Sequence, residues 1–191
     1  MKRRKAIGSI LLAGTATTIG FSGYEWYSIT KAPDKNYIVS RKGLLTELAE
    51  TIIPATDTPG AREAGVIDFM IPILNECTDK KTLNRFIEGL QHLEAYTHAK
   101  YAREYGQCTQ EEKESVLHYF EKKSSSSFAL YDKIKNKFAG KSFFTTLKSY
   151  TVYCYGISEK GATIGMRYIA VPGKNLPCIP LEPNQKTWAT K

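Results

Sequence analysis

The sequence has 191 residues, 42% of them apolar and 24% charged, with a formal net charge of +8. This length predicts one globular domain, and the lack of any repeat of about 20 to 50 residues excludes a solenoid. The basic excess does not indicate nucleic-acid binding. Four cations lie in the first five residues, and the other lysines are dispersed instead of forming a basic stripe.

The N-terminus has the outline of an export signal. Lys2-Arg3-Arg4-Lys5 precedes a weakly apolar run, residues 6–21, which three glycines interrupt. Paired Arg3 and Arg4 before such a run are typical of the twin-arginine route, which exports folded proteins. The run is shorter than the about 20 apolar residues of a spanning helix, and no clear cleavage site follows it. We expect residues 1–28 to be a twin-arginine-type signal. A Sec signal and a retained anchor are the alternatives, and cleavage stays open.

Residues 36–191 are expected to form a helical domain. Ser40 can cap a first helix that reaches Ile53, because apolar residues recur there at four-residue steps. These recurring positions are Leu44, Leu48 and Ile52. The first helix should therefore bury one face.

Two prolines and two glycines interrupt apolar sequence between Ile52 and Val66. Pro54 lacks an amide hydrogen and disfavours helical geometry in the residue before it, so the first helix should stop there. Pro59-Gly60 supplies a fixed φ followed by a residue that tolerates positive φ. The segment is therefore predicted to be a shaped corner between two helices. From these residues alone a connector without further function is the preferred explanation, because proline and glycine interrupt most helical domains.

Two further helices follow the corner. Dense apolar positions over residues 66–74 indicate a core helix, in which Pro72 can be accommodated as a kink. Thr78 or Asp79 then caps a long helix that is expected to end near Gly106.

Two further helices and an extended segment are predicted after the long helix. Thr109-Gln110-Glu111-Glu112 is a capping-box sequence, in which the hydroxyl and the glutamate each satisfy an unpaired amide. A further helix is predicted over residues 142–155, and the proline-rich segment 172–183 should run extended. No segment has the period-two alternation of a strand. The predicted fold is all-α, a single irregular bundle of about five helices with an extended Pro-rich C-terminal tail.

Four cysteines are present, and they are separated by 31, 46 and 24 positions: Cys77, Cys108, Cys154 and Cys178. Such spacings do not match the short pairs of zinc or iron–sulfur sites. In an oxidising compartment these residues could form one or two disulfides with unknown pairing. Buried free thiols are the equal alternative.

The sequence contains no recognisable catalytic or cofactor motif. His92 and His98 are six positions apart, so they do not share one helix face, and His118 is remote from both. No dinucleotide-binding glycine motif, nucleophile elbow or Walker sequence is present. We therefore expect no catalytic residue, no metal and no cofactor on this chain.

Three segments resemble one protein family. Leu45–Ala61 is similar to the L-x-x-L-A-E-x-I-I-P-x-T-D-T-P-G-A signature of the gluconate 2-dehydrogenase subunit 3 family. Phe143–Lys148 with Ser158–Gly161 resembles its F-F-x-x-L-K and S-E-x-G motifs, and Tyr168–Gly173 with Trp188 resembles its C-terminal end. The resemblance spans about residues 40–190. Between 78 and 127 it lies only in the helical rhythm, and Tyr153-Cys154-Tyr155 departs from the family pattern.

The resemblance implies a non-catalytic small subunit of an exported dehydrogenase complex. The partner it implies is a large FAD-dependent subunit of the glucose-methanol-choline (GMC) type, which oxidises a sugar, sugar acid or polyol. The small subunit would assist the maturation, export and stability of that partner. A cytochrome c subunit or the quinone pool would accept the electrons. The implied location is periplasmic or membrane-associated, with peripheral membrane association.

The resemblance also selects the residues expected at the partner interface: Thr56, Asp57, Pro59, Gly60, Tyr155, Ser158 and Trp188. The alternative function is a stand-alone envelope binding or interaction protein without a flavoprotein partner. An independent enzyme is disfavoured because no acid–base constellation is visible.

Overall fold

The computed structural model describes Tyr27, residues 31–124 and 140–171, and the following tail positions: Gly173, Cys178, Pro180, Leu181 and 183–189. These residues form helices and no β-strand, which confirms the all-α prediction. One isolated bridge pairs Arg167 with Trp188. Arg3 and Arg4 lie outside the described residues, as does much of the Pro-rich tail, so the export signal and the extended tail stay predictions.

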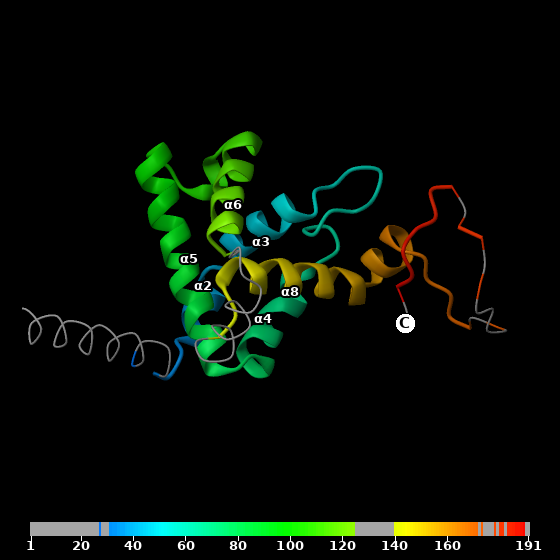
Figure 1. The fold of residues 1–191 in the computed structure, drawn as a ribbon, viewed down its shortest axis with the longest axis horizontal. Helices are drawn as coiled ribbons and strands as arrows, with labels where there is room; N and C mark the ends of the chain where they lie inside the picture. Colours follow the sequence, from blue (N-terminus) through cyan, green and yellow to red (C-terminus); the bar gives the residue numbers. More distant parts are fainter. Residues whose placement is uncertain are drawn as a thin grey trace, which may run out of the picture.

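The described helices, in chain order, are α2 (Lys35–Ser40), α3 (Lys42–Ile52), α4 (Val66–Pro72), α5 (Lys80–Tyr101), α6 (Gln110–Ser124) and α8 (Phe143–Ile157). Two π-helical turns, η1 (Ile73–Cys77) and η3 (Gly161–Gly165), follow α4 and α8, and a 3-10 turn, η2, spans Tyr105–Gln107. Helix α8 crosses the middle of the molecule and packs against α3, α4, α5 and α6 (Figure 1). No described helix is both long and apolar enough to cross a membrane.

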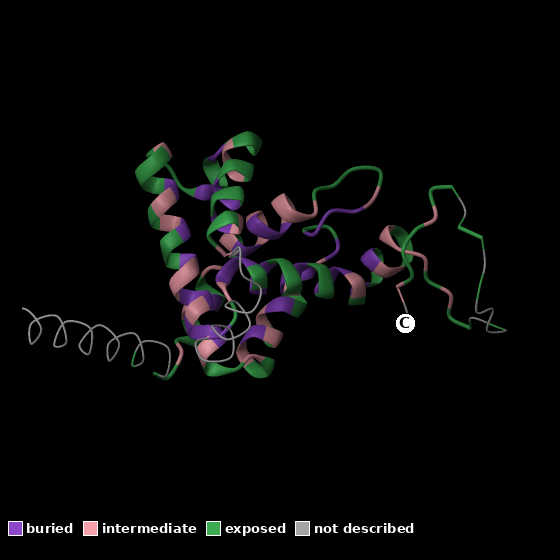
Figure 2. Ribbon diagram, viewed as in Figure 1, coloured by how far each residue is buried: buried purple, intermediate pink, exposed green. Residues whose placement is uncertain are grey.

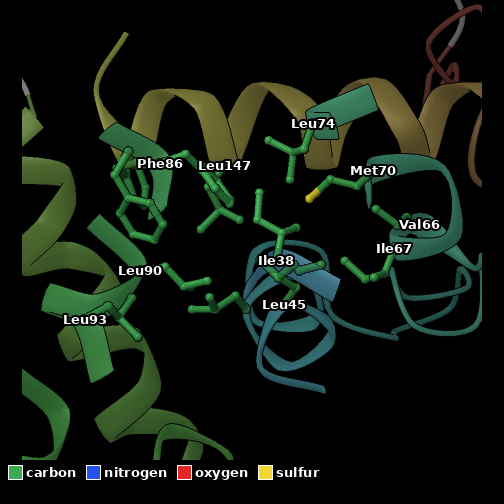
Figure 3. Close-up of a cluster of buried hydrophobic side chains, with 14 of the residues drawn as sticks. Ile38, Leu45, Val66, Ile67, Met70, Leu74, Phe86, Leu90, Leu93 and Leu147 are labelled. Atoms are coloured by element: carbon green, nitrogen blue, oxygen red, sulfur yellow. The ribbon is translucent and has the colours of Figure 1, made fainter. Parts of the chain in front are cut away.

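The core lies where α2, α3, α4, α5, α6 and α8 meet, and Figure 3 shows part of it. Its fully buried side chains include Ile38, Leu45, Met70, Leu90 and Leu147. Burying one such side chain contributes about 1.5–3 kcal/mol relative to leaving it exposed. The predicted apolar spacing therefore corresponds to the faces that stabilise the bundle.

Three helix starts agree with the sequence prediction. Asp79 caps α5, because its Oδ2 accepts from the Thr82 amide at 3.1 Å. The Thr109 hydroxyl accepts from the Glu112 amide at 3.3 Å, and the Glu112 carboxylate accepts from the Thr109 amide at 2.9 Å. Ser142 caps α8 in the same manner. These caps were predictable because each bond joins residues only three positions apart.

Two predicted helix ends are wrong. Ser40 does not cap α3; it is the last residue of α2, and its hydroxyl donates to the Tyr37 carbonyl. Helix α5 ends at Tyr101, before Ala102 in the left-handed conformation, and not near Gly106. Gly106 instead belongs to the separate turn η2. In both places a short helical turn that has no strong sequence signal precedes or follows the main helix.

Candidate functional site

The corner between α3 and α4, residues 53–65, is closed by its own backbone. The Ala61 amide donates to the Ile53 carbonyl at 2.9 Å, and the Val66 amide donates to the Ala61 carbonyl at 3.1 Å. Thr56 and Asp57 lie at the exposed tip of the loop. The corner predicted from the prolines and glycines is therefore present, with its polar tip facing solvent.

The Glu50 carboxylate at the end of α3 holds the two limbs of the corner together. Its Oε1 accepts from the Ala55 amide at 3.1 Å, and its Oε2 accepts from the Arg62 amide at 2.8 Å. Bonds from backbone amides to a carboxylate are stronger than neutral ones, because one partner is charged. Glu50 therefore determines the shape of the loop, although sequence reasoning did not single it out for this role.

Gly60 is required at the corner for close packing. A Cβ atom there would overlap with Glu50 Oε1 and lie 2.7 Å from the Ala55 amide nitrogen. Gly60 tolerates a positive φ but does not adopt one in the structure. The residue with positive φ is Gly65, at 65°, directly before α4.

Ion pairs of Glu47 link the corner to the rest of the bundle. Its carboxylate pairs with the Arg62 guanidinium at 2.5 Å and with Lys113 Nζ of α6 at 2.8 Å. Burial raises the pKa of Glu47, but the hydrogen bonds and positive charges of Lys113 and Arg62 outweigh this effect and lower it. Glu47 therefore stays ionised and links α3, the corner and α6.

The C-terminal end of α8 supports the corner from the other side. The buried Tyr155 hydroxyl donates to the Pro59 carbonyl at 2.8 Å. The Ser158 hydroxyl donates to the Tyr155 carbonyl at 2.8 Å and accepts from the Gly161 amide at 3.1 Å. A Cβ on Gly161 would overlap with the Tyr155 carbonyl oxygen. The Ser158–Gly161 motif is thus a compact turn that holds Tyr155 against the corner.

Four of the predicted interface residues are buried within the chain itself. These residues are Pro59, Gly60, Tyr155 and Ser158. Their contacts within the chain support the shape of the corner, and their place at a partner interface stays a prediction. Among the predicted residues at the corner itself, only those at the tip are exposed.

Trp188, the last predicted interface residue, does not lie at the corner. It is 36% exposed and lies on the segment after α8, with its ring 4.6 Å from the Arg167 guanidinium carbon. The Arg167 amide donates to the Thr187 carbonyl at 2.8 Å, and the Ala189 amide donates to the Arg167 carbonyl at 3.0 Å. We call this contact between Arg167 and Trp188 the tail clip.

A cleft of about 1050 Å³ lies between α2–α3 and the C-terminal half of α5. On its wall the Tyr37 hydroxyl donates to Glu94 Oε2 at 2.6 Å, and Arg41 pairs with Glu94 Oε1 at 2.9 Å. Burial and the hydrogen bond to Glu94 raise the pKa of Tyr37. Tyr37 and Arg41 are one helical turn apart, but Glu94 comes from α5, so no sequence signal joins the three.

The histidines and acidic residues do not form a metal centre in the part of the chain that the structure describes. No group of three or more His, Cys, Asp or Glu is placed there to hold an ion. His92, His98 and His118 are all exposed.

All four cysteines are free in the structure. Cys77 and Cys178 are exposed, whereas Cys108 and Cys154 are buried. Burial raises the pKa of Cys154 to about 11 and also raises the pKa of Cys108. The structure therefore contains no disulfide between the four cysteines that the sequence analysis considered.

The difference in burial predicts selective thiol labelling. At pH 8 a maleimide pulse should modify Cys77 and Cys178 at least about 100-fold faster than Cys154, because only the thiolate reacts and burial suppresses it. Mass spectrometry of tryptic peptides measures each rate. After unfolding in denaturant without reductant all four thiols should react, and a smaller number would instead demonstrate a disulfide.

Comparison with protein-family models matches residues 40–173 to the family described as gluconate 2-dehydrogenase subunit 3. No curated protein and no solved structure matches the sequence. The matched range contains the corner, Glu50, Tyr155 and Gly161, and it ends before Trp188.

Proposed function

Because the chain belongs to the gluconate 2-dehydrogenase subunit 3 family, we propose that it is the non-catalytic small subunit of an exported dehydrogenase complex. Its partner in this proposal is a GMC-type flavoprotein that carries FAD and oxidises a sugar, sugar acid or polyol. The observation that carries the proposal is the family match, which extends from Ser40 at the end of α2 to Gly173 after η3.

The geometry of the corner supports a role in binding a partner. Its tip presents the Thr56 hydroxyl and the Asp57 carboxylate, while Glu50 and Tyr155 hold the loop from inside. A loop that is already ordered loses less conformational entropy when it binds than a loose one does. The tip is therefore suited to give specific polar contacts at low entropic cost.

The N-terminal sequence supports a role in export. The twin-arginine route carries folded proteins, so a signal on this chain can export a partner that has already bound its flavin. We propose that the pair Arg3 and Arg4 brings the whole complex to the periplasmic side, where it stays peripherally associated with the membrane.

The proposal predicts that two conservative substitutions retain the flavoprotein in the cytoplasm. In the wild type, a gentle pull-down of this chain from the envelope fraction should recover a larger subunit with flavin absorption. With Arg3→Lys and Arg4→Lys together, the flavoprotein recovered outside the cytoplasm should fall at least about tenfold, because the transport route reads the arginine pair. Immunoblots and absorbance spectra of the fractions measure this effect.

A variant with Lys2→Arg and Lys5→Arg is the matched control, since it keeps both the charge and the arginine pair. It should export the flavoprotein normally. A partnerless, colourless chain in the wild-type pull-down would contradict the proposed function and favour a stand-alone envelope binding protein. Unchanged export of the flavoprotein by the double lysine variant would contradict the carrier role.

A further inference from the structure

The outward face of α8 is apolar in its C-terminal half. The inward face packs into the core through Leu147, Cys154 and Tyr155, as expected for a central helix. On the opposite side Val152, Tyr153 and Ile157 are 47%, 57% and 46% exposed. Figure 2 shows exposed positions along this side of α8. Such a cluster of exposed apolar side chains on a central helix is typical of a surface for association.

The segment after α8 folds back onto this same face. At about 100° per residue, position 156 lies between positions 152 and 153 around the helix axis. A Cβ on Gly156 would be 3.5 Å from Cε and 3.8 Å from Sδ of Met166, so Met166 lies over the exposed face. Arg167, the next residue, begins the tail clip. The apolar face of α8 and the clip are therefore one continuous surface.

The chain that forms the clip is basic. From Gly161 to Lys191 inclusive, the sequence contains four basic side chains and one acidic side chain, Glu182. Arg167 covers the Trp188 ring, and Lys186 Nζ donates to the Ile164 carbonyl at 2.5 Å. Both described cations thus contact an aromatic ring or a carbonyl at the edge of the surface. A partner that covers this edge is expected to supply carboxylates.

We propose that Val152, Tyr153, Ile157 and Met166, together with the tail clip, form the docking surface for the large dehydrogenase subunit. This inference rests on the proposed function and assigns the partner-facing surface of that function. The partner's matching patch is apolar at its centre and acidic at its rim. Tyrosine, tryptophan and arginine are the residue types that dominate binding energy at interfaces, and Tyr153, Trp188 and Arg167 supply one of each.

The proposed surface lies at the same end of the molecule as the corner. Tyr155 of α8 bonds to Pro59, and Lys160 pairs with Glu63 at 3.0 Å. In Figure 1 the corner and the tail lie on the side of α8 away from α5. One partner subunit can therefore contact the tip of the corner and the α8 face together.

Affinity of the full chain for its flavoprotein tests this assignment. The double variant Tyr153→Ala with Ile157→Ala should weaken the purified complex at least about tenfold, as loss of central interface side chains does. Both residues are exposed, so the variant should keep the wild-type helical signal and melting temperature. Raising ionic strength from about 0.1 M to about 0.5 M should weaken the wild-type complex further, because it screens the basic rim.

The matched control is Val39→Ala on α2, which removes a 52% exposed apolar side chain outside the surface and should leave affinity unchanged. A wild-type flavoprotein complex that the double variant does not weaken would overturn this surface and leave the proposed function standing. Absence of any flavoprotein complex in the wild type would overturn the proposed function itself. If the double variant instead abolishes self-association, a second copy covers the face and the proposal is wrong.

Discussion

Replacing Gly60 by alanine is expected to lower the free energy of unfolding by about 3 kcal/mol. The added Cβ would overlap with Glu50 Oε1 and press on the Ala55 backbone. The carboxylate can move only by giving up its bonds to the Ala55 and Arg62 amides, and a hydrogen bond to a charged group contributes about 1.5–3 kcal/mol. Overpacking of the backbone adds to this loss. Thermal unfolding should therefore occur roughly 6–12 °C lower.

Gly43→Ala is the control for this substitution. Gly43 lies in α3, and no atom lies within 4 Å of a Cβ built on it. Alanine should leave stability unchanged or raise it by up to about 1 kcal/mol, because glycine loses more backbone entropy in a helix. Circular dichroism melts of both variants give the comparison. Equal stability of the Gly60 and Gly43 variants would mean that the corner adapts freely and is not held by Glu50.

Gly161→Ala is expected to cost at least about 3 kcal/mol. Its Cβ would overlap with the Tyr155 carbonyl oxygen and lie 2.7 Å from Ser158 Oγ. Both obstacles are part of the turn itself, so relief requires a backbone shift, and such overpacking is among the few causes of large single-site losses. The shift should also weaken the bond from Tyr155 to Pro59. We expect this variant to lose the flavoprotein partner as well as stability.

Gly156→Ala tests whether the loss of stability expected for Gly161→Ala is specific to that position. A Cβ on Gly156 would make only ordinary contacts with the Met166 side chain. Because Gly156 lies inside α8, alanine there should not destabilise the helix. Chemical denaturation, which reports the free energy directly, is suited to both variants. A Gly161 variant as stable as the Gly156 variant would show that the turn after α8 tolerates a side chain.

Gly60 and Gly161 belong to segments that are distant in the chain but form one structural unit. The Tyr155–Pro59 hydrogen bond joins positions 96 residues apart. Damage to either segment should therefore deform the tip at Thr56 and Asp57 and so weaken partner binding without any contact to the partner. This gives a physical reason why both segments carry the family resemblance although Pro59, Gly60, Tyr155 and Ser158 are buried.

On α8, the residues that we propose to contact the partner are likewise distinct from those that support the corner. Tyr153 and Ile157 point outward, while Tyr155, between them in sequence, points inward to the corner. The structure thus divides the tyrosines of this helix by the helix face on which they lie. Variants at the outward positions should change affinity alone, whereas Tyr155 variants should change stability first.

The sequence by itself determined the local features of this protein. The helical periodicity, the break at Pro54, the caps at Asp79 and Thr109 and the start of a helix near Ser142 were predicted correctly, because each depends on backbone geometry or on bonds within a few residues. The family resemblance was also readable, since it depends on short motifs. Local physics was therefore sufficient for the fold class and the position of the corner.

Only the tertiary structure decided what those motif residues do. Gly60 is constrained by Glu50 ten positions away, and Tyr155 by Pro59 across the bundle. Which side of α8 is covered depended on the packing of α3, α4, α5 and α6 around it. Sequence spacing cannot show such relations, because burial, steric overlap and long-range hydrogen bonds exist only once distant segments pack together.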